Sequence, residues 1–386
     1  MYQLFAVTQP GLEAITRQEM LSLGFSVRKT GAHSTESAGG VEFDASLADL
    51  YRANLTLRTP GRIISRVGQF TATNFAELRK KAAHLPWHQY LNPGRPLAIR
   101  VTCHKSKLYH SDGVAERIGG AIGDCFHQPV SPVKFDEDED NSLPQLVIVR
   151  LSHDDCTISV DSSGALLHRR GYRLASAKAP LRENLAAALL MAAGWEAQTP
   201  LMDPFCGSGT IAIEAALLAA QIAPGKNRRF AFMDWPSYDA KLWQRLLEEA
   251  AAAEHIPTAP ILASDRDAGA IKLATANAER AGVAAYIQFT HQAFSAMQPP
   301  SGPGWLVCNP PYGVRVSSAH DLRNLYAQLG HVLRTLCPGW QAGVLCNSQY
   351  LIGHTRLKFP RQLKLVNGGI PVIFYMGSVP QKQKIA

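Results

Sequence analysis

Apolar and polar residues alternate along this chain with two periods, one typical of strands and one typical of helices. In the first part the expected strands cover Tyr2–Val7, 40–43, 97–102 and 146–151, and the expected helices cover 11–23 and 47–55. Short units of this kind predict two small α+β modules that follow one another, the second running from about residue 63 to residue 161.

The second half is organised around a strand, a loop and a helix. The apolar run Leu201–Asp203 ends in an acid, a turn with Gly207 and Gly209 follows, and an Ala/Leu-rich helical pattern continues to about Ala223. In open α/β sheets ligands bind at the carboxyl ends of strands, where glycine lets the backbone approach a cofactor. The lysine of a phosphate-binding loop is absent, and a purely structural glycine turn remains an alternative.

A second apolar run, 304–308, stops at Asn309, Pro310, Pro311 and Tyr312. Proline cannot continue a sheet interior, so Asn309 is expected at the end of the strand. Its side-chain carbonyl and the backbone carbonyl of Pro310 then offer two acceptors, with the ring of Tyr312 beside them. This set of groups suits a planar base that carries an exocyclic amino group.

The rest of the second half predicts a mixed sheet. A buried strand ends at Asp265, Asp267 is expected to cap a helix over 268–281, and Gln292 follows a strand over 285–290. The last expected elements are a helix over 321–336, a strand over Gln341–Cys346, and a hairpin of 362–366 and 371–379 joined at Asn367.

Length, net charge and cysteine content indicate the number of domains, the kind of partner and the cellular compartment. A chain of 386 residues suggests two or three domains, and its net charge of +8 mildly favours a polyanionic partner. No apolar run reaches a membrane-spanning length and the start lacks a signal peptide, so we expect a soluble, cytoplasmic protein. The seven scattered cysteines predict reduced thiols and no metal site, and the acidic run 136–140 is expected to be a solvated loop.

Two basic stretches are candidates for contacts with nucleic acid. The first contains Lys105 and Lys107, and the second contains Arg169, Arg170 and Arg173 just before the second half. Lysine and arginine bind phosphates, although an ordinary solvated turn or linker accounts for either stretch as well.

These motifs resemble those of a known family. The glycine loop with Asn309–Tyr312 resembles the class I S-adenosylmethionine-dependent methyltransferases that modify amino nitrogens. The first half resembles the THUMP-containing RNA methyltransferases, and the whole chain is most similar to the bacterial 23S rRNA guanine-N2 methyltransferases. The resemblance implies a ferredoxin-like domain (1–62), a THUMP domain (63–163), a basic linker (164–180) and a Rossmann-like methyltransferase domain with a seven-stranded mixed sheet (181–386).

The resemblance also implies roles for individual residues. Asn309, Pro310, Pro311 and Tyr312 would hold the base, while S-adenosylmethionine would be bound by residues of the glycine loop and the neighbouring strand ends: Asp203, Phe205, Gly207, Gly209, Thr210, Asp265 and Gln292. Many relatives have an acid near Gln292, so the adenine contact stays open. A transfer RNA substrate, adenine-N6 methylation and a non-catalytic RNA-binding factor remain alternatives, and the sequence does not determine the oligomeric state.

Overall fold

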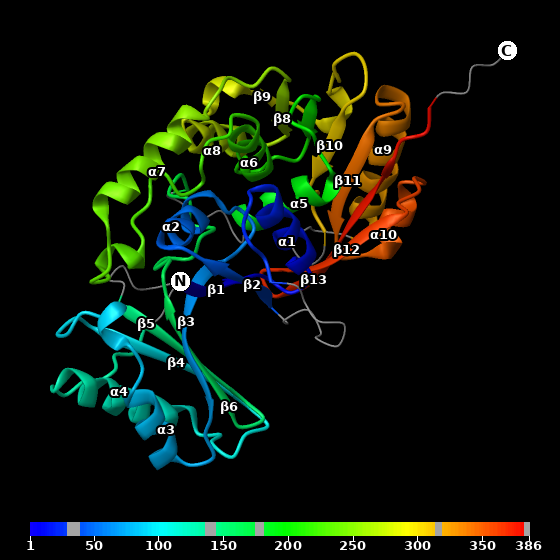
Figure 1. Ribbon diagram of the computed structural model, residues 1–386. Helices are drawn as coiled ribbons and strands as arrows, with labels where there is room; N and C mark the ends of the chain where they lie inside the picture. Colours follow the sequence, from blue (N-terminus) through cyan, green and yellow to red (C-terminus); the bar gives the residue numbers. More distant parts are fainter. Residues whose placement is uncertain (29–38, 136–143, 174–180, 313–318, 382–386) are drawn as a thin grey trace. The chain divides into compact units, whose positions relative to one another are not determined.

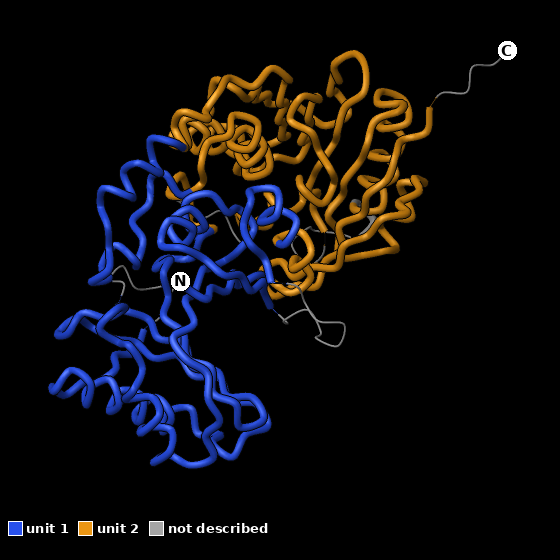
Figure 2. The backbone as a smooth tube through the Cα atoms, viewed as in Figure 1, with its two compact units in different colours: residues 1–8, 17–167, 225–249 blue, residues 9–16, 168–224, 250–386 orange. Residues whose placement is uncertain are grey.

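The computed structural model describes residues 1–28, 39–135, 144–173, 181–312 and 319–381 (Figure 1). They form two compact units, which Figure 2 colours separately. Unit 1 comprises residues 1–8, 17–167 and 225–249, and unit 2 comprises 9–16, 168–224 and 250–386. The units are therefore not consecutive in sequence, unlike the four segments expected above. The predicted acidic loop at 136–140 lies outside the described residues.

A six-stranded sheet forms the centre of unit 1, in the order β2-β1-β3-β6-β5-β4. Its strands are β1 (Tyr2–Val7), β2 (Gly40–Ala45), β3 (Arg62–Thr71), β4 (Leu97–His104), β5 (Gln145–Ser152) and β6 (Asp155–Asp161). Only β4 and β5 are parallel. The long strand β3 pairs with β1 through its first half and with β6 along most of its length. The two expected N-terminal modules thus share one continuous sheet.

Four helical segments of unit 1 lie between residues 47 and 126. They are α2 (Leu47–Thr56), α3 (Phe75–Ala83), the 3-10 turn η1 (Trp87–Gln89) and α4 (Ser111–Phe126). In α2 the Ser46 hydroxyl accepts the Asp49 N–H at 3.1 Å and the Asp49 carboxylate accepts the Ser46 N–H at 3.0 Å. This reciprocal cap satisfies two N–H groups that the helix leaves unpaired. Helices α3 and α4 lie side by side next to β3–β6 (Figure 1).

Residues 225–249 complete unit 1, although they interrupt the second half of the sequence. They contain η2 (Ala231–Asp234) and most of α7 (Ala240–Ala252). The Phe232 ring stacks on Tyr51 of α2 with centroids 4.3 Å apart, and the Asp239 N–H donates to the Tyr51 hydroxyl at 2.9 Å. Stacked, buried aromatic rings stabilise a core beyond their area alone, so this segment belongs to the folded body of unit 1.

Unit 2 is built on a seven-stranded sheet in the order β12-β13-β11-β10-β7-β8-β9. The strands are β7 (Leu201–Asp203), β8 (Ile261–Asp265), β9 (Ile287–His291), β10 (Trp305–Cys308), β11 (Gln341–Cys346), β12 (Arg361–Asn367) and β13 (Ile370–Ser378). The five strands β11, β10, β7, β8 and β9 are parallel, β13 is antiparallel to its neighbour β11, and β12 is antiparallel to β13. Gly368 and Gly369 form its turn, both with positive φ (57° and 81°). A two-residue turn of this kind matches the twist of the strands it joins.

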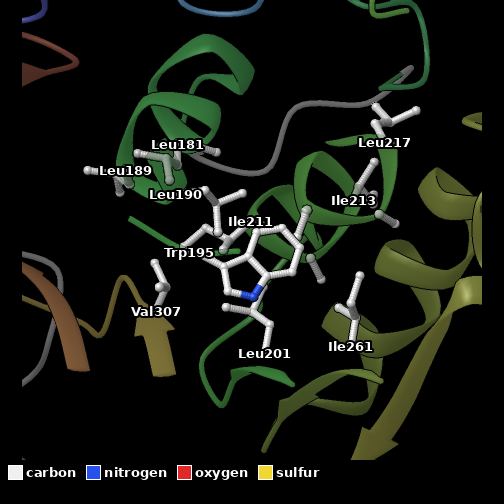
Figure 3. Close-up of a cluster of buried hydrophobic side chains, with 14 of the residues drawn as sticks. Leu181, Leu189, Leu190, Trp195, Leu201, Ile211, Ile213, Leu217, Ile261 and Val307 are labelled. Atoms are coloured by element: carbon white, nitrogen blue, oxygen red, sulfur yellow. The ribbon is translucent and has the colours of Figure 1, made fainter. Parts of the chain in front are cut away.

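The helices of unit 2 supply its core. They are α5 (Glu183–Ala193), α6 (Thr210–Ala219), α8 (Ala268–Arg280), α9 (Ala319–Leu336) and α10 (Gln349–His354), with 3-10 turns η3 (Ala284–Tyr286) and η4 (Phe294–Ala296). Leu190, Trp195 and Ile211 from α5, α6 and their connection gather near Leu201 and Val307 of the sheet (Figure 3). Asp267 caps α8 through the Gly269 N–H at 2.8 Å, as predicted. No helix among the described residues has the length and apolarity needed to cross a membrane.

Residues 9–16, with the first turn of α1 (Glu13–Ser22), belong to unit 2. The Gln9 side chain donates to the Val366 carbonyl of β12, and Leu12 is fully buried in the main core of this unit. Gly11 has φ 94°, and a Cβ there would meet the Lys364 carbonyl oxygen at 2.4 Å. Glycine is required at this position because the two backbones approach so closely.

Candidate active site

Three polar side chains mark one edge of the unit 2 sheet. Asp203 ends β7, Asp265 ends β8, and Asn309 follows β10 directly. These strands are parallel neighbours, with β7 between β8 and β10. Their carboxyl ends therefore meet at one edge, which is where open α/β sheets bind ligands.

The Asp265 carboxylate holds the glycine loop. Its Oδ2 accepts the Gly207 N–H at 3.0 Å, and its Oδ1 accepts the Asp267 N–H at 3.0 Å. Each carboxylate oxygen has a second lone pair, so further donors can still bind. Asp265, one of the residues expected to bind S-adenosylmethionine, is therefore also the one that fixes the loop in place.

The loop leaves room for a cofactor beside its backbone. Gly207 has φ 51°, and a Cβ built on it would meet nothing within 4 Å. Gly209 has φ 84°, and its Cβ would approach that of Ala274 at 3.0 Å. Gly209 is thus needed for packing against α8, while Gly207 presents open backbone at the sheet edge. This open cradle fits an adenosyl cofactor that lies along the backbone.

Asp203 is buried at the centre of this edge. Its Oδ1 accepts the Phe205 N–H at 3.3 Å, and only 2% of the residue is exposed. The pKa of Asp203 is raised to about 8, chiefly by burial; the Phe205 N–H opposes this rise and the nearby charge of Asp265 adds to it. The carboxyl group is consequently neutral over most of the physiological range in the free protein.

This raised pKa makes stability depend on pH. The unfolded Asp203 loses its proton near pH 3.9, whereas the folded group keeps it to about pH 8, so stability falls between these values as pH rises. The slope is about 1.4 kcal/mol per pH unit. We expect Asp203→Asn to remove this dependence of stability on pH. The unfolding midpoint of the variant minus that of the wild type should therefore increase from pH 5 to pH 8. A difference that stays constant over this range would contradict the assignment.

Asn309 offers an acceptor that nothing in the described residues uses. Its Oδ1 is buried and has no hydrogen-bond partner among them. A buried polar atom without a partner costs free energy, so a ligand that donates a hydrogen bond to Asn309 Oδ1 would recover it. Beside it, the Tyr312 hydroxyl accepts the Asn367 side-chain N–H at 3.1 Å, which ties the aromatic ring to the tip of the β12–β13 hairpin.

Tyr326 supports the Asn309–Tyr312 turn from behind. It lies fully buried on α9, with its hydroxyl 3.4 Å from the Pro311 carbonyl and 3.2 Å from Cys346 Sγ. Sequence reasoning missed both Tyr326 and Asn367 as site residues. Tyr326 has no local signal because it follows an ordinary helical pattern, whereas Asn367 was recognised only as a turn residue.

We expect Tyr326→Phe to lower turnover about ten-fold, because loss of the hydroxyl loosens the turn that aligns the base. Removal of one neutral hydrogen bond costs about 1 kcal/mol, so cofactor affinity and folding should change little. Turnover, S-adenosylhomocysteine affinity and the thermal midpoint are measured together. Tyr350→Phe, at an exposed tyrosine of α10, is the control. Equal losses in all three quantities would indicate a general defect in folding.

The other predicted cofactor residues line the same edge. The Phe205 ring lies 5.1 Å from that of Phe294, and both are packed in the second core cluster of unit 2. Gln292 is half-buried, and its N–H donates to the Asp265 carbonyl at 3.0 Å. This bond places Gln292 next to Asp265 without showing what its side chain binds.

The structure contradicts part of the predicted basic linker. Arg170 is buried and pairs with Glu214 of α6 at 3.5 Å, so it cannot reach a phosphate. Arg173 pairs with Glu183 at 3.5 Å and also donates to the buried Thr210 hydroxyl. Glu214 is buried in the apolar helix α6, and the buried Arg170 guanidinium offsets its charge.

The remaining basic candidates differ in exposure. Arg169 is half-buried. Lys105 and Lys107 are exposed in unit 1, just after β4, where the Asp154 carboxylate accepts the Lys107 backbone N–H at 2.7 Å. No group of three potential metal-binding side chains occurs in the part of the chain that the structure describes.

The order of the seven strands, the glycine loop with its two acids and the Asn-Pro-Pro-Tyr turn define a class I S-adenosylmethionine-dependent methyltransferase. Family models match three segments: the RlmL ferredoxin-like domain at 3–64, the THUMP domain at 72–161 and the RMKL-like methyltransferase domain at 170–374. The chain belongs to this family of THUMP-containing, RMKL-like RNA methyltransferases.

Individual relatives agree with this assignment. A Synechocystis protein provisionally named an RNA methyltransferase is 37% identical over 95% of this chain and 94% of its own length. The ribosomal RNA large subunit methyltransferase K/L of Syntrophotalea carbinolica is 36% identical over 95% of this chain. The match covers 52% of that protein, so the chain spans about half its length.

Solved structures of relatives share the whole fold. One described as a methyltransferase complexed with S-adenosylhomocysteine has a TM-score of 0.85 at 29% identity, over 100% of this chain and 99% of its own. A Listeria monocytogenes protein named as a predicted N6-adenine-specific DNA methylase has a TM-score of 0.86 at 32% identity, over 97% and 95% of the two chains. The chain accordingly uses S-adenosylmethionine as its methyl donor, and the open backbone at Gly207 stays the predicted place for this cofactor.

Proposed function

We propose that this enzyme methylates the exocyclic N2 amino group of a guanine in structured RNA, with 23S ribosomal RNA as the first candidate substrate and the cytoplasm as its location. The observation that carries the proposal is the buried, unpartnered Oδ1 of Asn309 at the end of β10. An acceptor of this kind fits a donor N–H from an amino group, and the Pro310 carbonyl supplies a second acceptor nearby.

The chemistry requires alignment more than activation. When bound, S-adenosylmethionine supplies a methyl group that its sulfonium already activates. The guanine amino nitrogen is a weak nucleophile because its lone pair is delocalised into the ring. Hydrogen bonds from this amino group to Asn309 Oδ1 and the Pro310 carbonyl would localise the lone pair and direct it. The Tyr312 ring would stack on the extruded base, and its bond to Asn367 would fix its orientation.

The transfer needs no strong base from the protein. As the N–C bond forms and the S–C bond breaks, the attacking nitrogen becomes acidic and loses a proton to water. Asn309 cannot accept this proton, so its role is to position the amino group and to stabilise the charge that develops on the N–H. The protein thus positions the amino group and water accepts the proton. This is consistent with a site whose hydrogen-bond acceptors are a side-chain amide and a backbone carbonyl.

The names of relatives support an RNA substrate of ribosomal origin. Several large-subunit rRNA methyltransferases match this chain, although it spans about half their length. The chain also contains the THUMP domain, and its net charge is +8. Net positive charge favours association with a polyanion but does not select a particular RNA.

An adenine-N6 methyltransferase is the second candidate. Two acceptors beside a flat ring accommodate the adenine amino group equally well, and one solved relative carries an adenine-specific name. A transfer RNA substrate would leave the same chemistry in place. A non-catalytic RNA-binding factor is less well supported, because such a factor has no use for a buried acceptor at the sheet edge.

Mass-spectrometric nucleoside mapping of ribosomal and transfer RNA, from cells with and without the gene, tests the proposal. Loss of one N2-methylguanosine from 23S RNA is the expected result. Its loss from transfer RNA would change the substrate and keep the chemistry, whereas loss of N6-methyladenosine would overturn the choice of base. An unchanged nucleoside profile would favour the binding factor.

A further inference from the structure

Strand β12 brings the tip of its hairpin to the edge of the unit 2 sheet where Asn309 lies. It is antiparallel to β13, and β13 is antiparallel to β11. Strand β12 therefore runs in the same direction as β10 and β11, so its last residue, Asn367, lies at the edge where those strands also end. The Asn367 side-chain N–H donates to the Tyr312 hydroxyl at 3.1 Å. The position of the hairpin tip consequently determines where Asn367 holds the Tyr312 ring.

Strand β12 is also at the outer end of its sheet, where β13 is the one described strand that pairs with it. An edge strand leaves a row of backbone groups outside the ladder. The Gln9 side chain donates to one of them, the Val366 carbonyl, which directly precedes Asn367. The Gly11 backbone lies against a second, the Lys364 carbonyl. These two carbonyls face the same side of β12, because their residues are two positions apart.

Residues 9–12, which we call the N-terminal brace, form an ordered turn that leads into α1. The Leu12 N–H donates to the Gln9 carbonyl at 3.0 Å, and the Gly11 N–H donates to the Glu13 carboxylate at 2.8 Å. The Leu12 side chain is fully buried in the same core cluster as Leu365 of β12. The brace is thus fixed to the body of unit 2 and contacts β12 through side chain and backbone.

We infer that the N-terminal brace is a positioning element of the active site. Through Val366 it fixes the hairpin tip, and through Asn367 it holds the Tyr312 ring in the orientation that stacks on the base. The brace lies within the segment 3–64 that matches the ferredoxin-like domain, although it folds with unit 2. This inference rests on the proposed role of Tyr312 and adds residues that act through it without touching the substrate.

The expected effect is on turnover, because this site contributes mainly alignment of the amino group with the methyl carbon. A shift of the Tyr312 ring changes that alignment. The cofactor loop is held separately, since the Asp265 carboxylate accepts the Gly207 N–H. Affinity for S-adenosylhomocysteine should therefore stay unchanged when the brace is altered.

Gly11→Ala is the first test. Its Cβ would collide with the Lys364 carbonyl oxygen, so β12 must move away from the brace. We expect turnover to fall about five-fold, the factor that corresponds to one neutral hydrogen bond. Gly24→Ala is the matched control: Gly24 has a φ of 78°, close to the 94° of Gly11, but a Cβ there would meet nothing within 4 Å. Both variants carry backbone strain, and only the first displaces β12.

Gln9→Ala is a milder second variant, because it removes the bond to the Val366 carbonyl without introducing a collision. Turnover should fall about three-fold. It decides the question if Gly11→Ala does not fold. Methyl transfer is measured with labelled S-adenosylmethionine and total RNA from a strain that lacks the gene. Calorimetry gives the affinity and stoichiometry of S-adenosylhomocysteine binding. Partial unfolding would lower the stoichiometry together with turnover, whereas a displaced Tyr312 ring lowers turnover alone.

A double-mutant cycle tests the route of the effect. Tyr312→Phe keeps the ring and removes the hydroxyl that Asn367 contacts. If the brace acts through this bond, Gln9→Ala should change turnover by less than two-fold in the Tyr312→Phe background. Full additivity of the two changes would overturn the inference. So would undiminished turnover in the Gln9 variant, or an equal loss of turnover in the Gly24 control.

Failure of the proposed function would look different. The assay counts transferred methyl groups and does not depend on which base accepts them. A wild-type enzyme whose product is N6-methyladenosine would overturn the proposed base, while the coupling between Gln9 and Tyr312 would still support the brace.

Discussion

Replacing Asn309 with alanine should lower the rate of methyl transfer about a thousand-fold, the loss typical when a single aligned group of an active site is removed. The change deletes the buried Oδ1 acceptor at the end of β10. The amino group would keep one acceptor, the Pro310 carbonyl, and its lone pair would no longer be held in line with the methyl carbon. Turnover is measured on RNA from a deletion strain.

Cofactor affinity should remain within about two-fold in this variant, because the glycine loop is held by Asp265 and not by Asn309. Asn347→Ala is the matched control, since Asn347 is exposed just after the neighbouring parallel strand β11. Undiminished methylation by the Asn309 variant would show that the catalytic assignment is wrong. A parallel loss in the Asn347 variant would show that this edge of the sheet is merely sensitive to substitution.

The second large effect is expected from Asp265→Ala, which should weaken S-adenosylmethionine binding by about a hundred-fold or more. The carboxylate accepts the Gly207 N–H, and we expect its remaining lone pairs to accept the ribose hydroxyls of the bound cofactor. Hydrogen bonds to a charged group contribute about 1.5–3 kcal/mol each, and two such bonds correspond to at least a hundred-fold in affinity. Isothermal titration with S-adenosylhomocysteine measures the change.

Asp267→Ala provides the control two residues away. Asp267 caps α8 through the Gly269 N–H, so its loss should cost about 1 kcal/mol of folding stability and leave cofactor affinity nearly unchanged. If both aspartates affected binding equally, the effect would come from the conformation of the loop after β8. Unaltered affinity in the Asp265 variant would remove Asp265 from the predicted cofactor site.

Much of unit 2 could be predicted because its signals are local. Strand ends are marked by Asp203, Asp265 and Asn309, and each mark depends only on a short apolar run followed by a polar turn. The cap at Asp267 and the hairpin after Asn367 are local in the same way. The long-range consequence, that the three strand ends meet at one edge, follows from the parallel order of the strands.

What could not be predicted depends on contacts between distant residues. Arg170 lies among basic residues in sequence, yet its environment is set by Glu214, 44 positions away and buried in α6. The sequence gives no signal at Arg100 or Arg150, because each is a single arginine within an apolar strand. The register between neighbouring strands brings these two residues and Arg66 to one face of the sheet. The local sequence of a strand does not determine which residues of the next strand it pairs with.

The exchange of segments between the two units also bears on how such proteins evolve. Residues 225–249 fold with unit 1 and residues 9–16 fold with unit 2, so the coding sequence of each unit is interrupted by that of the other. A recombination event near residue 170 would separate Tyr51 from Phe232 and Leu12 from its core. Selection should therefore preserve this chain as a single heritable block, and new domains can be gained by fusion at its ends far more readily than by exchange of its halves.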